Sequence, residues 1–237
     1  YILLLSVIIC ASVVTAQDDD DDACTLDVTF LLDASDSIGA DSQDLYKWNY
    51  LKEFAADVTR KLDISREDIH VAAAKFSNVG RVEFILSRYY TASSAARAIE
   101  GMTLISESSS VSAGIRKVDS DIWGRDGDRD EAANVLVIIS DGRFDDATDA
   151  AVAANKAKGR GVIIIPVGAG KDASENLMET IASNDNQVII VPDFDELDSE
   201  VNRLVDYIDE YRVDLCPRPG PTGNTGATGP TGSKGPT

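Results

Sequence analysis

The stretch that organises this chain is LDVTFLLDASDSIG, residues 26–39. Its first part, Leu26–Leu32, is short and apolar and contains β-branched residues, which predicts a buried strand. Directly behind it, one carboxylate and two hydroxyls follow at alternate positions, on Asp33, Ser35 and Ser37. A turn containing Gly39 lets these side chains face one point, and hard oxygen ligands of this kind suit a divalent cation. The stretch therefore predicts a cation site at a strand end.

Helical and strand patterns alternate along the rest of the chain. Apolar residues recur at three- and four-residue steps over 41–62, which predicts a long amphipathic helix. Short strands over 69–76 and 82–86 flank the turn sequence Asn78-Val79-Gly80 and predict a hairpin at a sheet edge. Further helices are expected over 91–99, 112–122, 147–158, 173–182 and 194–211, and further strands over 134–140, 162–167 and 187–191.

This alternation predicts an α/β fold with a doubly wound, mostly parallel sheet and one antiparallel edge strand. Ligands of such sheets bind at the carboxyl ends of the strands. Asp33 and Asp141 each follow a predicted strand, so we expect both carboxylates beside one cation. A serine-rich loop, 106–110, precedes a predicted helix and can add a hydroxyl. Two acids and three hydroxyls make the incomplete octahedron that Mg²⁺ prefers, completed by water and a partner's carboxylate.

The motifs of this site resemble the metal-ion-dependent adhesion site of a von Willebrand factor type A domain. The resemblance covers residues 24–216 and is carried by Asp33-X-Ser35-X-Ser37, a later hydroxyl ahead of residues 114–118, and Ile139-Ser140-Asp141-Gly142. It implies a bound Mg²⁺, or Ca²⁺ or Mn²⁺. It further implies that Ser35 and Ser37 ligate the metal directly, while Asp33 and Asp141 hold it through water.

The middle motif of the site departs from the family's Gly-Gly-X-Thr-X-Thr pattern. Counting back from Gly114-Ile115 places Ser109 where the family has its threonine ligand, with Ser108 and Ser110 as alternatives. A simpler interpretation is that Asp33 and the nearby serines only cap the first long helix. Capping would leave the second strand end, at Asp141, unexplained.

The N-terminal segment predicts export. Residues 1–16 are uncharged, shorter than the roughly 20 residues that span a bilayer, and end in the small residues of a cleavage site. We expect an N-terminally truncated signal peptide cleaved after Ala16, a buried strand or an anchoring helix being the alternative. Residues 17–23 then form an acidic spacer whose five aspartates, Asp18–Asp22, are expected to be disordered. Loose binding of calcium or a mineral surface is the alternative use of this block.

Two cysteines remain after removal of the predicted signal peptide, which contains Cys10. Cys24 and Cys216 bracket the patterned region, and in a secreted chain such a pair predicts a disulfide that closes the ends of a domain. An intermolecular pairing is the alternative, because flanking cysteines also join the chains of assemblies.

Residues 217–237 have the pattern of a collagen triple helix. Glycine recurs at every third position, with proline directly after several glycines, as the crowded axis of that helix requires. This pattern predicts a collagen-like region, truncated here, and association into a homo- or heterotrimer; a flexible linker is the alternative. The glycines are Gly220, Gly223, Gly226, Gly229, Gly232 and Gly235.

Enzyme chemistry and polyanion binding are not indicated. The net charge of -19 disfavours nucleic acid and anionic membranes as partners. His70 is the only histidine and has no nucleophile pattern nearby, so we expect a packed or edge histidine rather than part of a triad. The sequence around Gly168 and Gly170 lacks the third glycine of a dinucleotide loop, and Ser35 stands where a phosphatase would need a second acid.

Together these observations predict a secreted, non-enzymatic extracellular-matrix protein that resembles a collagen with an N-terminal type A domain. The domain is expected to bind an acidic residue of matrix proteins such as collagens through its metal, without a membrane span. The alternative is a structural or acidic mineral-associated matrix component whose metal site is not used.

Overall fold

One six-stranded sheet forms the centre of the molecule in the computed structural model, which describes residues 25–39 and 45–214. The strand order is β3-β2-β1-β4-β5-β6, and only β3 runs antiparallel to its neighbour. This confirms the predicted α/β fold with one antiparallel edge strand. The strands are β1 (Leu26–Asp33), β2 (Ile69–Phe76), β3 (Gly80–Phe84), β4 (Ala133–Ser140), β5 (Ile163–Ala169) and β6 (Ile189–Val191).

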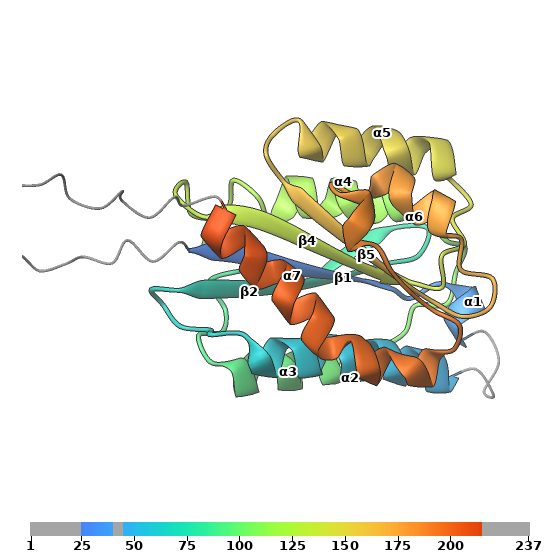
Figure 1. Ribbon diagram of the computed structural model, residues 1–237, viewed down its shortest axis with the longest axis horizontal. Helices are drawn as coiled ribbons and strands as arrows, with labels where there is room; N and C mark the ends of the chain where they lie inside the picture. The colour runs from blue at the N-terminus through green and yellow to red at the C-terminus, as the bar shows by residue number, and fades with distance from the viewer. Residues whose placement is uncertain (1–24, 40–44, 215–237) are drawn as a thin grey trace, which may run out of the picture.

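Helices cover both faces of the sheet, as Figure 1 shows. One face carries α2 (Leu45–Lys61), α3 (Ala92–Glu100) and α7 (Val201–Asp214), and the other carries α4 (Val111–Asp121), α5 (Ala147–Lys158) and α6 (Glu175–Ile181). The short helix α1 (Asp36–Gly39) lies at one end of the sheet, opposite the end where β1 begins. Two 3₁₀ segments complete the described part of the chain, η1 (Asp185–Gln187) and the longer η2 (Phe194–Glu200).

Strand β1 separates two hydrophobic cores. All of its residues are buried, the polar Asp27, Thr29 and Asp33 included, as expected for a parallel strand covered on both faces. Phe30 packs in the core that contains Trp48 of α2, whereas its neighbour Leu31 packs in the core that contains Ile115 of α4. Because side chains alternate along a strand, β1 is anchored from both sides and its carboxyl end is fixed in place.

Several predicted boundaries differ from the structure for local reasons. The predicted helix over 41–62 is observed as α2 from Leu45, and α1 before it was not predicted. The edge strand begins at Gly80, which pairs with Phe76, and ends at Phe84, where a turn follows. The predicted strand over 187–191 is shortened because residues 185–187 form η1. The predicted helix over 194–211 begins as η2 and continues as α7 to Asp214.

Other predictions lie outside the described residues. They concern the signal peptide over 1–16, the acidic spacer over 17–23, the pair Cys24 and Cys216, and the collagen-like region over 217–237. Within the described ranges, no helix has the length and apolarity needed to cross a membrane.

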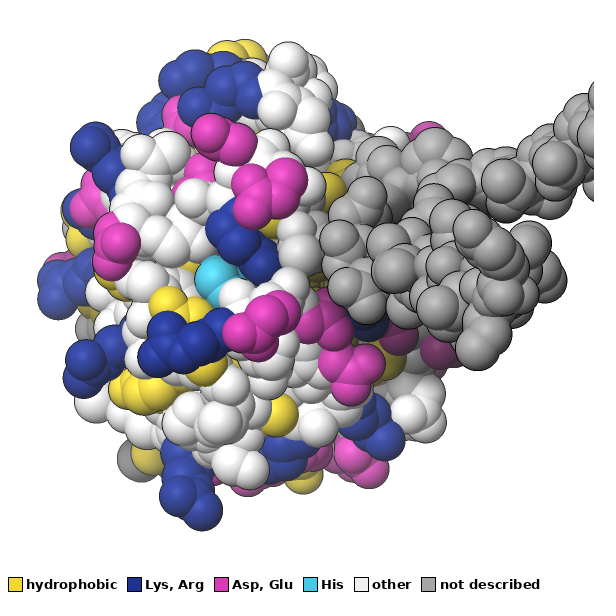
Figure 2. All heavy atoms as spheres, turned by 90° about the vertical axis from the view of Figure 1, so that its left-hand side faces the viewer, with side chains coloured by type: hydrophobic (Ala, Val, Ile, Leu, Met, Phe, Trp, Pro, Cys, Tyr) yellow, Lys and Arg dark blue, Asp and Glu magenta, His cyan; other side chains and the backbone are white. Residues whose placement is uncertain are grey.

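A buried ion pair closes the end of the sheet where β1 begins. The Asp27 carboxylate, fully buried, accepts hydrogen bonds from the backbone N and the guanidinium of Arg129 at 2.7–3.0 Å. His70 lies beside it, with Nδ1 3.2 Å from the Gly127 carbonyl oxygen and Nε2 3.1 Å from that of Arg66. Figure 2 shows this end, with acidic and basic side chains interspersed around the histidine. His70 therefore has a packing role here, as the sequence predicts.

Candidate metal centre

Two neighbouring strand ends bring Asp33 and Ser140 together. Strands β1 and β4 pair in parallel, with Leu32 beside Ile139, so the next residue of each strand leaves the sheet at the same edge. The Ser140 hydroxyl donates to Asp33 Oδ2 at 2.7 Å, and the Ser35 backbone N donates to Asp33 Oδ1 at 3.0 Å. Both oxygens of this carboxylate are therefore oriented by the protein, and the side chain is fully buried.

The ionised form of the Asp33 carboxylate is unfavourable in this position. Burial, and after it the negative charge of Asp141, raise the pKa of Asp33 to about 7, although hydrogen bonds from Ser35 and Ser140 oppose the shift. Asp141 is itself only 5% exposed. A divalent cation near both groups would offset the desolvation and the mutual repulsion of the two carboxylates.

The predicted ligands Ser35 and Ser37 also lie side by side. Their hydroxyl oxygens are 3.1 Å apart, in a turn closed by a 3.1 Å hydrogen bond from Ile38 N to the Ser35 carbonyl. Ile38 is buried in the core that includes Phe30, which fixes this turn against the end of β1. The alternation of carboxylate and hydroxyls seen in the sequence is thus held as one compact loop.

The serine-rich loop contains three candidates that differ in their surroundings. Ser108 is exposed. Ser110 is the N-cap of α4: its hydroxyl accepts a hydrogen bond from Ala113 N at 3.3 Å and donates one to Asp146 Oδ2 at 2.7 Å. Ser109 is buried, and its Oγ has no hydrogen-bond partner among the described residues. A buried hydroxyl without a partner is unfavourable unless a ligand satisfies it, which favours Ser109 as the metal ligand.

Backbone hydrogen bonds tie this loop to the first motif. Ser106 N donates to the Ala34 carbonyl, and Asp36 N donates to the Glu107 carbonyl, both at 2.8 Å. Ser106 has a φ of 63°, a left-handed conformation that is strained for a serine. The two loops are therefore held together even at the expense of backbone strain.

Sequence reasoning missed two residues that shape the site. Asp146 accepts hydrogen bonds from Ser110 Oγ, Val111 N and Ser112 N, and so fixes the first turn of α4. Arg143 donates to Asp141 Oδ2 through Nε at 3.1 Å and through Nη2 at 2.9 Å. Both follow Asp141-Gly142 closely in sequence, but nothing in the local pattern states which groups they would meet.

The residues present fit a divalent cation. Within the described residues, no three His, Cys, Asp or Glu side chains cluster closely enough to hold a metal. The candidate centre instead combines two carboxylates with serine hydroxyls, and this set of hard oxygens suits Mg²⁺, Mn²⁺ or Ca²⁺. The unpartnered Ser109 hydroxyl and the buried acid pair are the features that such an ion would satisfy.

Comparison with known families identifies the domain. A family model described as von Willebrand factor type A domain matches residues 27–203. The chain belongs to this family. The type A domain thus accounts for every strand of the sheet and for the loops that hold the candidate ligands.

Relatives of this type A domain are parts of much longer proteins. It is 30% identical over 206 residues to von Willebrand factor A domain-containing protein 2 of Xenopus laevis, covering 85% of this chain and 25% of that protein. It is 31% identical over 182 residues to the collagen alpha-6(VI) chain of Mus musculus, covering 76% and 8%. Human matrilin-4 is 28% identical over 206 residues, with 84% and 31% covered. The chain therefore spans less than a third of the length of these relatives.

Solved structures share the fold of the type A domain. Proximal thread matrix protein 1 from the mussel byssus superposes with a TM-score of 0.69 at 22% identity, over 79% of this chain and 46% of that one, in a structure described as having a zinc-occupied MIDAS motif. Manganese-loaded TRAP protein of Plasmodium vivax superposes with a TM-score of 0.63 at 18% identity, over 78% and 74%. At these identities the likeness concerns the fold.

Proposed function

We propose that this type A domain is a metal-dependent adhesion module of the extracellular matrix. Asp33, Ser35, Ser37, Ser109 and Asp141 hold Mg²⁺, and an acidic side chain of a matrix protein such as a collagen completes its coordination. The observation that carries the proposal is the buried acid pair at adjacent strand ends, together with the buried Ser109 hydroxyl, which has no hydrogen-bond partner among the described residues.

The relatives support this assignment. They include collagen and matrilin chains, which are extracellular-matrix proteins. Two structural neighbours are described with zinc or manganese bound. These metals belong to those proteins, and Mg²⁺ is our assignment from the oxygen-rich ligand set.

Each residue of the site has a separate task in this proposal. Ser140 and the Ser35 backbone N orient the Asp33 carboxylate, while Asp146 holds the start of α4 and thereby the segment that carries Ser109. The cation would supply an electrophilic point of attachment for a partner's carboxylate. Because the proposed direct ligands are neutral serine hydroxyls and the two acids act through water, the bound cation would stay electrophilic toward that carboxylate.

Titration of the full chain with Mg²⁺, followed by calorimetry and reversed with EDTA, tests the proposal. We expect wild-type protein to bind Mg²⁺ and Asp33→Asn to lose binding. Asp36→Asn is the matched control, because it removes the same charge from an exposed position in the same loop. Absence of binding at millimolar Mg²⁺ would contradict the adhesion function and favour a purely structural role.

We further propose that the chain is secreted, that Cys24 and Cys216 form a disulfide, and that residues 217–237 belong to a collagen-like trimer. The strict glycine period supports the last point, because only glycine fits at the axis of a triple helix. Analytical ultracentrifugation of the full chain at low temperature should show trimers. Gly226→Ala should weaken them, whereas Thr225→Ala should not. A monomer at all concentrations would contradict the trimer.

A further inference from the structure

We propose that Arg143 acts on the metal and on the acidic partner in opposite directions. Its guanidinium competes with the cation for Asp141, and once the cation is bound the same group contacts the partner's carboxylate. This inference rests on the proposed function and assigns a specificity-determining residue to that site.

Arg143 occupies both oxygens of Asp141. The Arg143 backbone N donates to Oδ1 at 3.1 Å, and its side chain donates twice to Oδ2, at 2.9 and 3.1 Å. The Asp141 side chain is 6% exposed, whereas that of Arg143 is 51% exposed. The ion pair thus joins the buried, fixed carboxylate of Asp141 to a guanidinium that remains accessible from solvent.

This ion pair opposes metal binding. A divalent cation held by Asp141, directly or through water, must share Oδ2 with the guanidinium and is repelled by its positive charge. Both guanidinium hydrogen bonds go to Oδ2, and hydrogen bonds between charged groups are stronger than neutral ones, so the competition is appreciable. Removing the guanidinium should therefore strengthen metal binding.

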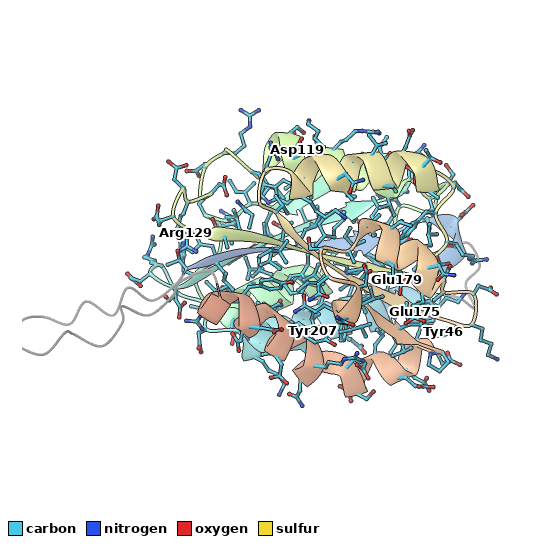
Figure 3. The ribbon with its side chains drawn as sticks, turned by 45° about the horizontal axis from the view of Figure 1, so that its top comes forward. Tyr46, Asp119, Arg129, Glu175, Glu179 and Tyr207 are labelled. Atoms are coloured by element: carbon cyan, nitrogen blue, oxygen red, sulfur yellow. The ribbon has the colours of Figure 1, made fainter. Side chains whose placement is uncertain are left out.

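The Arg143 side chain has a second acidic neighbour. Its Nη1 is 3.9 Å from Asp172 Oδ2, an exposed carboxylate in the loop after β5, so the side chain can leave Asp141 without losing every acidic neighbour. Arg143 and Lys171 also line a pocket of about 240 Å³ that includes Asp141, Tyr46 and Phe194. Tyr46, labelled in Figure 3, lies at the same end of the molecule as α1 in Figure 1.

The charge of the whole chain explains why an acidic partner needs this residue. With a net charge of -19, the protein repels acidic ligands at long range, and the metal alone has to overcome that repulsion. Arg143, displaced from Asp141, offers a planar fork that matches a carboxylate beside the metal. The same side chain that weakens the metal site therefore strengthens recognition of the ligand.

The test measures two affinities on the full chain. The first is the Kd for Mg²⁺ by calorimetry, and the second is the Kd for N-acetylglutamate amide at saturating Mg²⁺ by NMR, with N-acetylglutamine amide as the uncharged control. Variants are Arg143→Gln, Arg143→Lys and Arg60→Gln. Arg60 is the matched control because it is likewise a partly exposed arginine paired with two acids, Asp57 and Glu100, near the far end of α2.

For Arg143→Gln we expect Mg²⁺ to bind roughly threefold to fivefold more tightly, as an ion pair worth up to about 1 kcal/mol implies. The glutamate amide should bind more weakly by a similar factor. Arg143→Lys should fall between, and Arg60→Gln should match wild type in both measurements.

Specific outcomes overturn the inference. If Arg143→Gln binds Mg²⁺ no more tightly than wild type, Arg143 does not compete with the metal. The same conclusion follows if the affinities for Mg²⁺ and for the glutamate amide change in the same direction. If Arg60→Gln changes both affinities as much as Arg143→Gln does, the effect comes from the net charge of the protein and not from the position of Arg143. If wild type, Arg143→Gln and Asp33→Asn all fail to bind Mg²⁺, the proposed function fails, whereas normal wild-type binding with no effect of Arg143→Gln rejects this inference alone.

Discussion

At the scale of single residues, Ser109 and Ser110 are sequence neighbours with different surroundings. Ser110 caps α4 and bonds to Asp146, whereas the buried Ser109 hydroxyl has no partner among the described residues. The sequence left these serines as alternatives because both precede the same helix. The choice of Ser109 as a ligand stays a prediction, and the structure shows how to test it.

Substituting each of the two serines should separate metal binding from stability. Ser109→Ala removes a proposed ligand, so we expect Mg²⁺ affinity to fall about tenfold or more with little change in the free energy of unfolding. Ser110→Ala removes an N-cap and should cost about 1 kcal/mol. Calorimetry and urea unfolding measure the two effects. Equal metal affinities for Ser109→Ala and wild type would exclude Ser109 as a ligand.

The raised pKa of Asp33 should make the affinity for the metal depend on pH. Burial raises the pKa of Asp33 to about 7, so protons compete with the cation below neutral pH. Mg²⁺ should therefore bind about tenfold more weakly at pH 6 than at pH 8. A Kd for Mg²⁺ that stays constant between these values would contradict a metal role for this carboxylate.

The raised pKa of Asp33 also determines how the stability of the metal-free protein changes with pH. The pKa of Asp33 is higher in the folded chain than its ordinary value of 3.8, so the folded state holds the proton more tightly. Its contribution therefore favours folding at low pH and is lost as the pH rises through about 7. Asp33→Asn should reduce this dependence, as measured by urea unfolding in EDTA across that range.

At the scale of secondary-structure elements, close packing of α4 on the sheet positions the serine loop. Gly114 lies where α4 crosses β1 and β2, and an added Cβ would lie 2.9 Å from Phe76 Cβ and 3.0 Å from Leu31 Cδ2. The glycine thus permits an approach that no other residue would allow. That approach sets the position of the N-terminal end of α4, which follows Ser109.

Gly114→Ala should destabilise the domain by about 1–3 kcal/mol through overpacking, although alanine favours helices. Gly159→Ala, at the C-terminal end of α5, is the matched control because the nearest atom to its added Cβ is the Asn155 carbonyl at 3.3 Å. Urea unfolding compares the two variants. A fully stable Gly114→Ala would show that α4 can move away from the sheet without cost.

The bounds of helices and strands were predicted well where the sequence pattern sets them and poorly where local turns set them. Helix α5 was predicted with both bounds as observed, because alanine-rich sequence precedes the stop at Gly159. The first residues of the predicted helix over 194–211 form η2 instead, and Asn184 initiates the turn that shortens β6. Such turns depend on side-chain-to-backbone bonds that compete with regular structure.

At the scale of the whole molecule, the candidate metal centre and the ion pair of Asp27 with Arg129 lie at opposite ends of the sheet. Figure 3 shows Arg129 and Tyr46 at opposite sides of the molecule. Asp27 is the second residue of the buried strand β1 and Asp33 is its last. The strand joins the two charged sites, but their separation along its length weakens the direct interaction between their charges.

Arg129→Ala should destabilise the protein by about 3–5 kcal/mol, because it leaves the buried Asp27 carboxylate unpaired. Burial already raises the pKa of Asp27 despite the hydrogen bonds from Arg129. Thermal unfolding measures the loss of stability, and Mg²⁺ affinity of the folded variant should be unchanged. A Kd for Mg²⁺ that shifts with Arg129→Ala would show that the two ends are coupled.

The sequence by itself determined the fold class and the neighbourhood of the site. Continuous apolar runs are buried on both faces of a parallel sheet, and the carboxyl ends of adjacent strands have to meet at one edge, so Asp33 and Asp141 could be paired without coordinates. Only the tertiary structure decided that the buried Ser109 hydroxyl has no partner among the described residues, that Arg143 covers Asp141 and that Asp146 holds α4. Those facts depend on how loops distant in sequence pack against one another, which no local pattern encodes.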